Sequence, residues 1–233
     1  MKDQIDIQFV SDVMCPWCVV GLGNLNQALA QLDDKVSANM TFQPFELNPD
    51  MPQEGQDFDE HIQQEYGISK EQSDQNRQAI KERGQEVGFD FSFKPESRMW
   101  NSFDAHRLLH WAEHEEKQAE LKNALFKAHF THAQNVSDHD VLASLAAAVG
   151  LDPKAAKGIL ESGQFADEVR QKEAFWQQNN ITSVPTVIIN NKYAISGGQP
   201  ADVFKEALEE IISKEKAGSG KMRLSPRCEI IAA

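Results

Sequence analysis

The chain has 233 residues, of which 40% are hydrophobic and 25% are charged, and its formal net charge is −13. This length and composition predict a soluble chain with one sizeable core, or one domain that carries a large insertion. Nucleic acid is not expected as a partner because the sequence has no basic stripe. A membrane is not expected either, because no apolar run reaches the roughly 20 residues that span a bilayer.

The first segment predicts a strand that leads into a cysteine pair. Residues 5–10 alternate between apolar and polar types, which is typical of a half-buried strand. No leader-like combination of positive and apolar residues precedes it, so we expect a cytoplasmic protein. Disulfides are rarely structural in that compartment. The pair Cys15 and Cys18, within SDVMCPWCVV (11–20), is therefore expected to be catalytic or metal-binding.

A helix and a second strand are expected next. The helix, from about residue 16 to 32, is predicted by its apolar positions Val19, Leu22, Leu25, Leu29 and Leu32. Pro16 suits its first turn, where a missing N–H does no harm. Gly21 and Gly23 weaken the helix locally, and we expect them to admit another segment closely. SANMTFQPFEL (37–47) predicts a strand. Because Pro44 cannot donate a hydrogen bond to a neighbouring strand, we expect it at a sheet edge or at a strand end.

The middle of the chain, from about residue 55 to 165, shows helical periods and little strand signal. Its expected helices lie at residues 101–116, 119–133, 137–150 and 152–163, and another follows at 165–180. Ser137 is the expected cap of the third helix, with Asp140 at the capping-box position and Gly150 as its stop.

Strand signals return near the C-terminus. VPTVIIN (184–190) is β-branched and apolar, Asn190 and Asn191 suit a hairpin turn, and KYAIS (192–196) suits the partner strand. A last helix is expected at residues 197–216, and a flexible tail at 217–233. A proline at the start of a buried strand cannot donate to the ladder. A cis bond before Pro185 would explain this placement and leave backbone there free to meet another group, but X-Pro pairs also simply punctuate loops. The residues alone leave both interpretations open, and the family resemblance described below implies the cis bond.

The cysteine spacing fits thiol chemistry at the start of a helix. Unpaired N–H groups and the positive end of the helix dipole favour a thiolate at Cys15, and thiols in this setting have pKa values of about 3.5–7.5. Cys18 lies one turn further on, where it can resolve a mixed disulfide formed at Cys15.

The pair could also belong to a zinc site or be accidental, and the sequence leaves both alternatives open. The zinc site would draw on His106, His110 and His114, which recur at i, i+4 spacing on one predicted helix. Structural zinc sites normally combine two short-spaced ligand pairs, and a second C-x-x-C is absent from the sequence. No metal or cofactor is therefore expected.

Five separated blocks resemble one known family. They are SDVMCPWCVVG (11–21), NSFDAHRLLHWA (101–112), HDVLASLAAAVGLD (139–152), SVPTVIIN (183–190) and YAISGGQP (193–200). In these blocks the chain resembles DsbA-type thioredoxin-fold oxidoreductases, and it looks closest to their FrnE-like branch. The resemblance implies an α/β protein, a thioredoxin fold with a large all-helical insertion between its βαβ and ββα halves. The thioredoxin-like domain would comprise residues 1–50 and 165–216, the helical insertion 51–164, and the flexible tail 217–233.

The resemblance also implies roles for the site residues. Cys15 would be the nucleophile and Cys18 the resolving thiol, with the redox potential tuned by Pro16 and Trp17 between them. DsbA enzymes usually carry His where this chain has Trp17, so we expect a weaker oxidant. Some relatives carry a further cysteine pair near the C-terminus, but only Cys228 is present here, so a second redox centre is not supported.

Val184 and Pro185 would offer backbone to an extended peptide or to glutathione, and His106 matches a histidine of the family's second block. His106 fits a helix histidine satisfied by packing equally well. The expected partner is a protein or peptide that bears a disulfide or thiol, with glutathione as an optional redox partner or co-substrate. The chain would be a monomer or a homodimer.

The leading functional hypothesis is a cytoplasmic thiol–disulfide oxidoreductase that oxidises, reduces or isomerises disulfides. The alternative is a glutathione-dependent isomerase or transferase of the 2-hydroxychromene-2-carboxylate isomerase or kappa type, which shares the fold implied here. Those enzymes typically have Ser in place of the first cysteine, so Cys15 speaks against this alternative. A third hypothesis is a non-catalytic holdase, with an apolar groove lined by aromatic residues such as Phe89, Phe91 and Phe93.

Overall fold

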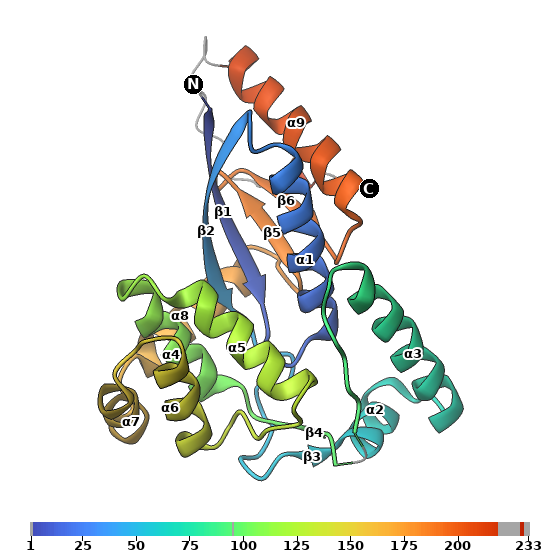
Figure 1. The fold of residues 1–233 in the computed structure, drawn as a ribbon, viewed down its shortest axis with the longest axis vertical. Helices are drawn as coiled ribbons and strands as arrows, with labels where there is room; N and C mark the ends of the chain where they lie inside the picture. Colours follow the sequence, from blue (N-terminus) through green and yellow to red (C-terminus); the bar gives the residue numbers. More distant parts are fainter. Residues whose placement is uncertain (1, 95, 219–228, 231–233) are drawn as a thin grey trace.

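The computed structural model of the chain describes residues 2–94, 96–218 and 229–230. It has the predicted α/β architecture: one mixed sheet carries helices on both faces, and a group of further helices gathers at one end of it (Figure 1). Among these residues, no helix combines the length and the apolar character needed to cross a bilayer.

Five strands form the main sheet of the described residues. In the order in which they lie side by side, they are β2 (Val36–Pro44), β1 (Asp3–Ser11), β5 (Thr186–Ile189), β6 (Tyr193–Ser196) and β7 (Glu229–Ile230). β1 and β2 are parallel and are joined through α1 (Pro16–Gln31). β5 is antiparallel to both β1 and β6, and α9 (Ala201–Gly218) follows β6. The βαβ and ββα halves expected from the sequence thus share one sheet.

Part of the segment that was predicted to be a flexible tail, residues 217–233, has regular secondary structure. α9 continues to Gly218, and β7 pairs in parallel with β6. The other residues of the segment, Cys228 among them, lie outside the described residues.

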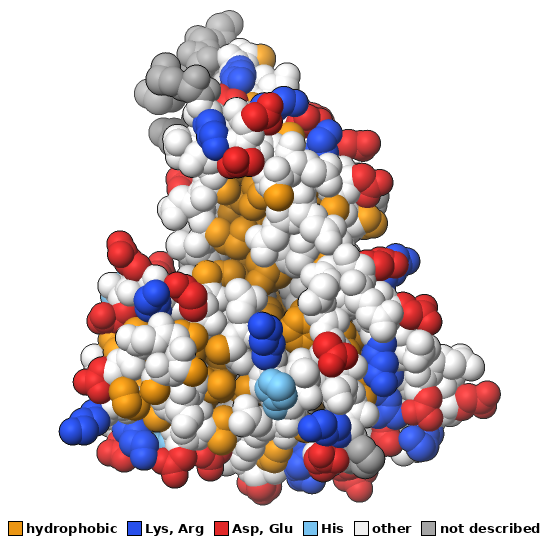
Figure 2. Space-filling view, in the orientation of Figure 1, with side chains coloured by type: hydrophobic (Ala, Val, Ile, Leu, Met, Phe, Trp, Pro, Cys, Tyr) orange, Lys and Arg blue, Asp and Glu red, His pale blue; other side chains and the backbone are white. Residues whose placement is uncertain are grey.

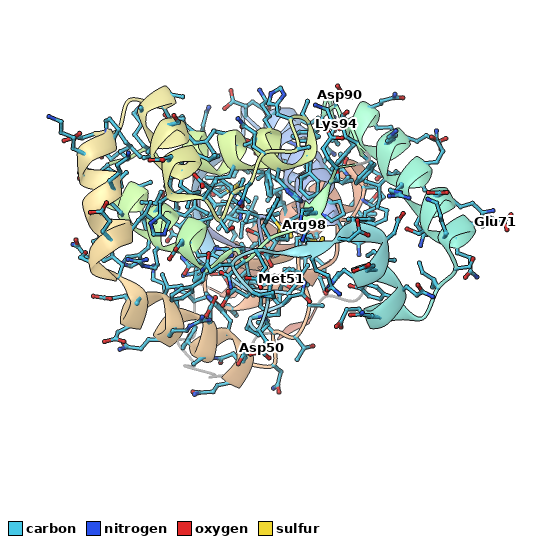
Figure 3. The ribbon with its side chains drawn as sticks, turned by 90° about the horizontal axis from the view of Figure 1, so that it is seen from below. Asp50, Met51, Glu71, Asp90, Lys94 and Arg98 are labelled. Carbon is cyan, nitrogen blue, oxygen red and sulfur yellow. The ribbon has the colours of Figure 1, made fainter. Side chains whose placement is uncertain are left out.

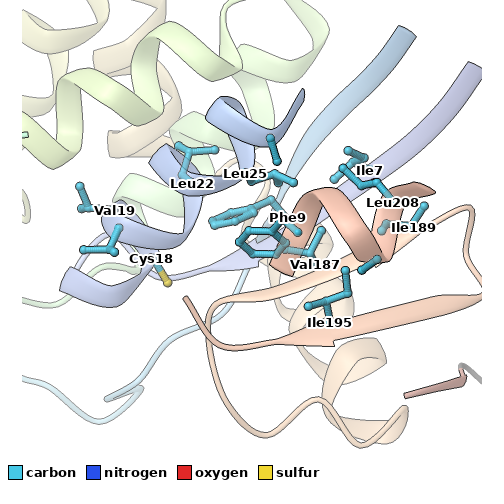
Figure 4. Packing of buried hydrophobic residues seen from close by; sticks show 14 of the residues in the cluster. Ile7, Phe9, Cys18, Val19, Leu22, Leu25, Val187, Ile189, Ile195 and Leu208 are labelled. Atoms are coloured by element: carbon cyan, nitrogen blue, oxygen red, sulfur yellow. The ribbon is translucent and has the colours of Figure 1, made fainter. Parts of the chain in front are cut away.

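Alternation along the strands builds two hydrophobic clusters, because successive side chains point to opposite faces of a sheet. Phe9 and Val187, which are register partners, belong to the cluster that α1 and α9 cover, and Figure 4 shows them at its centre. Val10 and Ile188, one residue further along, pack on the opposite face against Trp176 of α8 (Ala166–Gln178). Figure 2 shows hydrophobic side chains gathered in the hollow between β2 and α1. The core therefore fixes β1, and with it the position where α1 begins.

The hairpin between β5 and β6 forms as the sequence predicts. Asn190 and Asn191 have φ angles of 52° and 53°, the left-handed conformation that both central residues of a type I′ turn require. Asn is among the few residues that adopt it at little cost.

The segment between β2 and β5 is mainly helical. Its helices are α2 (Phe58–Tyr66), α3 (Lys70–Glu86), α4 (Phe103–His114), α5 (Gln118–Phe130), α6 (His139–Ala148), α7 (Pro153–Ser162) and α8 (Ala166–Gln178). It also holds a two-residue antiparallel ladder, β3 (Gln56–Asp57) with β4 (Arg98–Met99), which the sequence analysis did not expect. Strands this short carry no detectable periodicity. Seen from below, Arg98 and Met51 lie near the middle of this end of the molecule, and Glu71 projects from its rim (Figure 3).

The cap of α6 differs from the prediction of Ser137. The Asp138 carboxylate accepts hydrogen bonds from the backbone N–H groups of Asp140 and Val141 at 2.9 and 3.0 Å. The Ser137 hydroxyl is engaged elsewhere, 3.0 Å from the carbonyl oxygen of Gln53 and 2.7 Å from a side-chain oxygen of Asn135. A distant contact thus decides which of two suitable residues caps the helix.

One side chain anchors the helical segment to the sheet. Gln118, at the start of α5, accepts from the Phe42 N–H at 2.8 Å and donates to the Phe42 carbonyl at 3.0 Å. It thereby satisfies the outer edge of β2 as a neighbouring strand would. Lys122 lies four residues further along, on the same face of the helix, so this anchor directs it toward the interior. The domain boundaries at residues 50 and 164 remain a prediction, because α8 packs against both β2 and α4.

Candidate active site

The cysteine pair lies where β1 passes into α1, as predicted. Cys15 occupies the N-cap position, with an extended backbone at φ −94° and ψ 112°, and Pro16 opens the helix. The Cys15 N–H donates to the Asp12 carbonyl at 3.3 Å, and the Cys18 N–H donates to the Cys15 carbonyl at 3.1 Å. The first turn of α1 and the positive end of its dipole are therefore adjacent to the Cys15 side chain.

The two thiols are free and have different surroundings. Cys15 is 4% exposed and lies beside Trp17, which is 43% exposed, whereas Cys18 is fully buried at the margin of the cluster in Figure 4. Burial raises the pKa of the Cys18 thiol well above its usual value, and a hydrogen bond to Cys15 and the negative charge there raise it further. Cys18 therefore holds its proton firmly while Cys15 is a thiolate.

The Val184–Pro185 bond is cis, as the family resemblance implies, and its loop faces the cysteines. The Cys15 sulfur lies 3.7 Å from the Val184 carbonyl oxygen. Gly21 makes this approach possible, because a Cβ there would lie 2.9 Å from Cγ of Pro185 and 3.1 Å from Cα of Gly198. The close approach expected for Gly21 is thus that of the loop before β5.

Below the cysteines lies a buried carboxylate, Asp12. Its two oxygens accept from the N–H groups of Met14 at 3.2 Å and Leu47 at 2.7 Å. Burial by itself would raise the pKa of Asp12, but the neighbouring His106 and the Leu47 N–H lower it below its ordinary value. Asp12 therefore contributes a negative charge beneath the pair, a role that the sequence analysis did not assign.

His106 lies in the interior, which agrees with the second of its two interpretations, a helix histidine satisfied by packing. It is 2% exposed, and its Nε2 lies 3.4 Å from the nearer Asp12 oxygen. It is thus an interior neighbour of Asp12. His110 and His114 contact each other edge-on, and both rings lie tilted against Phe165. Within the described ranges, no three His, Cys, Asp or Glu side chains are grouped to hold a metal ion.

Lys122 of α5 is the main component of the site that sequence reasoning missed. It is fully buried, and its Nζ lies 4.9 Å from the ring centroid of Phe126. Burial lowers the pKa of Lys122 to about 8, although the negative charges of Cys18, Asp12 and Cys15 raise it in part. In the sequence it looks like an ordinary surface lysine of an amphipathic helix, and only the docking of α5 on β2 buries it.

A second buried cluster lies alongside. Glu46 and Glu173 both bind the Arg170 guanidinium, Glu173 at 2.9 Å. Burial, followed by the charge of Glu173, raises the pKa of Glu46 to about 7. Close to neutrality this carboxyl group therefore changes its protonation state.

Comparisons with known proteins agree with this architecture. Residues 6–209 match the model of the DsbA-like thioredoxin domain. The chain is 31% identical over 209 residues to the uncharacterized protein YwbO of Bacillus subtilis, covering 88% of this chain and 96% of that protein.

Solved structures show the same fold. A probable DsbA oxidoreductase from Streptomyces coelicolor has a TM-score of 0.84 at 28% identity, covering 95% of this chain and 93% of that one. A 2-hydroxychromene-2-carboxylate isomerase has a TM-score of 0.68 at 16% identity, covering 91% and 98%. The cytosolic disulfide reductase DsbM from Pseudomonas aeruginosa has a TM-score of 0.63 at 15% identity, covering 90% and 99%. The chain has the thioredoxin fold and belongs to the DsbA-like thioredoxin domain family.

Proposed function

We propose that the protein is a cytoplasmic thiol–disulfide oxidoreductase that cycles Cys15 and Cys18 between dithiol and disulfide. The observation that carries this proposal is the placement of Cys15 at the N-cap of α1, 3.7 Å from the Val184 carbonyl and three residues before the fully buried Cys18. A lone nucleophilic cysteine would not need a buried second thiol one turn below it.

In the reducing direction, the Cys15 thiolate attacks one sulfur of a substrate disulfide. A mixed disulfide forms, and the first substrate thiolate leaves with the electron pair of the broken S–S bond. Cys18 then loses its proton and attacks the Cys15 sulfur, which releases the second substrate thiolate. Two protein thiols are oxidised to one disulfide and one substrate disulfide is reduced to two thiols. The oxidising direction is the reverse of these steps.

Substrate would lie along the loop that contains Val184 and Pro185. Val184 is partly buried, and its carbonyl already faces Cys15, so an extended peptide placed there would pair with backbone beside the reacting sulfur. Trp17, half exposed beside the pair, would contact the substrate. We propose protein or peptide disulfides as substrates and glutathione as a redox partner, with no bound cofactor. Pro16 and Trp17 would set the potential.

Reduction of insulin disulfides and the potential of the pair in glutathione buffers test this function. Cys15→Ala should abolish insulin reduction, whereas Cys18→Ala should trap a mixed disulfide at Cys15. Cys228→Ser serves as the matched control and should retain activity. Insulin reduction by Cys15→Ala would refute the assignment of the nucleophile.

Two outcomes would favour the competing hypotheses. Glutathione-dependent turnover of a hydroxychromene substrate that survives Cys18→Ala would favour the isomerase. Protection of unfolding clients by the Cys15→Ser, Cys18→Ser double variant would favour a holdase.

A further inference from the structure

A small internal cavity lies between the end of β2 and helices α4, α5 and α8. It has a volume of about 10 Å³, and its polar lining comes from Gln43, His106, His110, Lys122 and Lys172. A cavity of this size holds about one water molecule, provided that polar groups surround it. The lining therefore suits a single bridging water.

Two residues on this lining carry a buried atom that needs a partner. Lys122 Nζ and His110 Nδ1 make no hydrogen bond to any residue that the structure describes, whereas His106 Nε2 lies 3.4 Å from Asp12. Buried polar atoms are almost always hydrogen-bonded to protein or to ordered water. Since Lys122 and His110 come from two helices and line the same cavity, one water there would serve both of these residues.

Lys122 and His106 border the cavity on its inner side, and His110 and Lys172 border it on its outer side. At the inner end, Lys122 lies within electrostatic reach of Cys18, Cys15 and Asp12. At the outer end, His110 and Lys172 also line a groove of about 690 Å³ between β1, β2 and α8. The cavity thus lies between the buried Lys122 side chain and a groove on the far side of the sheet from α1.

We propose that Lys122 accepts the proton of Cys18 in the resolving step, and that the cavity beside His106 and His110 passes it to the groove. This inference rests on the proposed oxidoreductase function. It addresses a requirement of that function, because Cys18 is fully buried and a thiol must lose its proton before it attacks a disulfide.

Lys122 Nζ makes no direct hydrogen bond to Cys18, so a water must bridge the two groups. The S–H bond of Cys18 breaks, its proton passes over this water to the neutral amine of Lys122, and the electron pair stays on sulfur. That sulfur attacks Cys15 of the mixed disulfide, the new S–S bond forms, and the substrate sulfur leaves as a thiolate. The ammonium of Lys122 then loses one proton through the cavity, and the neutral amine is restored. In the oxidising direction the proton returns along the same route.

The charges around Lys122 suit this exchange. The pKa of Lys122, lowered to about 8, gives substantial populations of both amine and ammonium near neutrality. Asp12 stays charged and attracts the arriving proton, while burial holds the pKa of His129 at about 4, so its ring is neutral. At the groove, Lys172 is paired with Glu113 at 3.1 Å. Lys122 is therefore the group at the inner end of the cavity that gains and loses a proton near pH 8.

Ellman's reagent, an aromatic disulfide, separates the two chemical steps in a Cys228→Ser background. Cys15 attack releases one coloured thiolate in a second-order phase, and Cys18 resolution releases another in a first-order phase. We expect Lys122→Met to slow the first-order phase by about 10²-fold, the usual size of a lost proton acceptor, and to affect the second-order phase far less. In wild type the first-order rate should level off at or below about pH 8, because Cys15 is uncharged in the mixed disulfide. In Lys122→Met it should keep rising.

Lys122→Arg is the matched control, because it keeps the positive charge but cannot act as a proton acceptor near neutrality. A slow first-order phase in Lys122→Arg supports proton transfer, and a wild-type rate in either variant overturns it. His110→Phe fills the cavity from its outer end. It should slow the first-order phase alone, and an unchanged rate overturns the route. If wild type releases no second thiolate, the oxidoreductase function itself fails, which is a distinct result.

Discussion

Replacing Lys122 with methionine should stabilise the folded protein near neutral pH. Burial lowers the pKa of this lysine from 10.5 to about 8, and each pKa unit corresponds to about 1.4 kcal/mol. Keeping the side chain charged in the folded state therefore costs about 3 kcal/mol below pH 8. Methionine has a similar shape without the charge. Losing the contact of Nζ with the Phe126 ring, at 4.9 Å, offsets about 0.5–2 kcal/mol, so the net gain is about 1–3 kcal/mol.

The stability gained by replacing Lys122 with methionine depends on pH. Between about pH 8 and 10.5 the unfolded state binds more protons at this lysine than the folded state does. Wild-type stability therefore rises with pH across this window, and below pH 8 the full cost persists. The methionine variant lacks this dependence. Its advantage over wild type is largest below pH 8 and shrinks as pH approaches 10.5.

Urea unfolding followed by tryptophan fluorescence at pH 7 and pH 9.5 measures this difference by linear extrapolation. Lys127→Met, on the same helix but exposed, is the matched control and should change stability by no more than about 0.5 kcal/mol. A Lys122→Met protein that is less stable than wild type at pH 7 would refute the expected cost of the buried charge. An equal gain at both pH values would show that packing, and not charge, is responsible.

Three further changes test other parts of the site. Burial and the charge of Glu173 raise the pKa of Glu46 from 4.5 to about 7, so the folded state binds more protons than the unfolded state between these pH values. Wild type should therefore lose stability as pH rises across this window, whereas Glu46→Gln should not. Melting temperatures measured from pH 4 to 8 would show the difference. Gln118→Leu leaves the Phe42 N–H and carbonyl unpaired; it should cost about 1–3 kcal/mol in urea unfolding, and unchanged amide exchange at Phe42 would contradict this. Gly21→Ala places a Cβ 2.9 Å from the Pro185 ring; it should lower stability by about 1–3 kcal/mol and slow insulin reduction, and wild-type values of both would show that the loop yields freely.

Local sequence signals were sufficient where neighbouring residues determine the conformation. The strand–cysteine–helix order and the turn at Asn190 and Asn191 follow from residue types with strong backbone preferences. The cis bond before Pro185 does not, because trans is the preferred form even before proline; it was expected from the family resemblance. Gly21 could be identified as a point of close contact, although its partner, the loop before β5, could not.

Long-range packing decided the features that were missed. Ser137 and Asp138 are both good caps, and the contact of Ser137 with Gln53, 84 positions away, leaves Asp138 as the cap. Lys122 has no distinguishing neighbours in the sequence. Its burial follows from the contact of Gln118 with β2, which spans 76 positions. His106 was placed near the site correctly, but helical periodicity could not show that it faces inward to Asp12.

The Gln118 anchor has a consequence for how the chain could be shortened or recombined. Hydrogen-bonding groups on an outer strand can pair with a strand of another molecule and so promote aggregation. By occupying both groups of Phe42, a single amide side chain blocks such pairing at that position of β2. A derivative that lacks α5 would present these groups to other copies, and we expect it to self-associate even if the rest of the sheet folds normally.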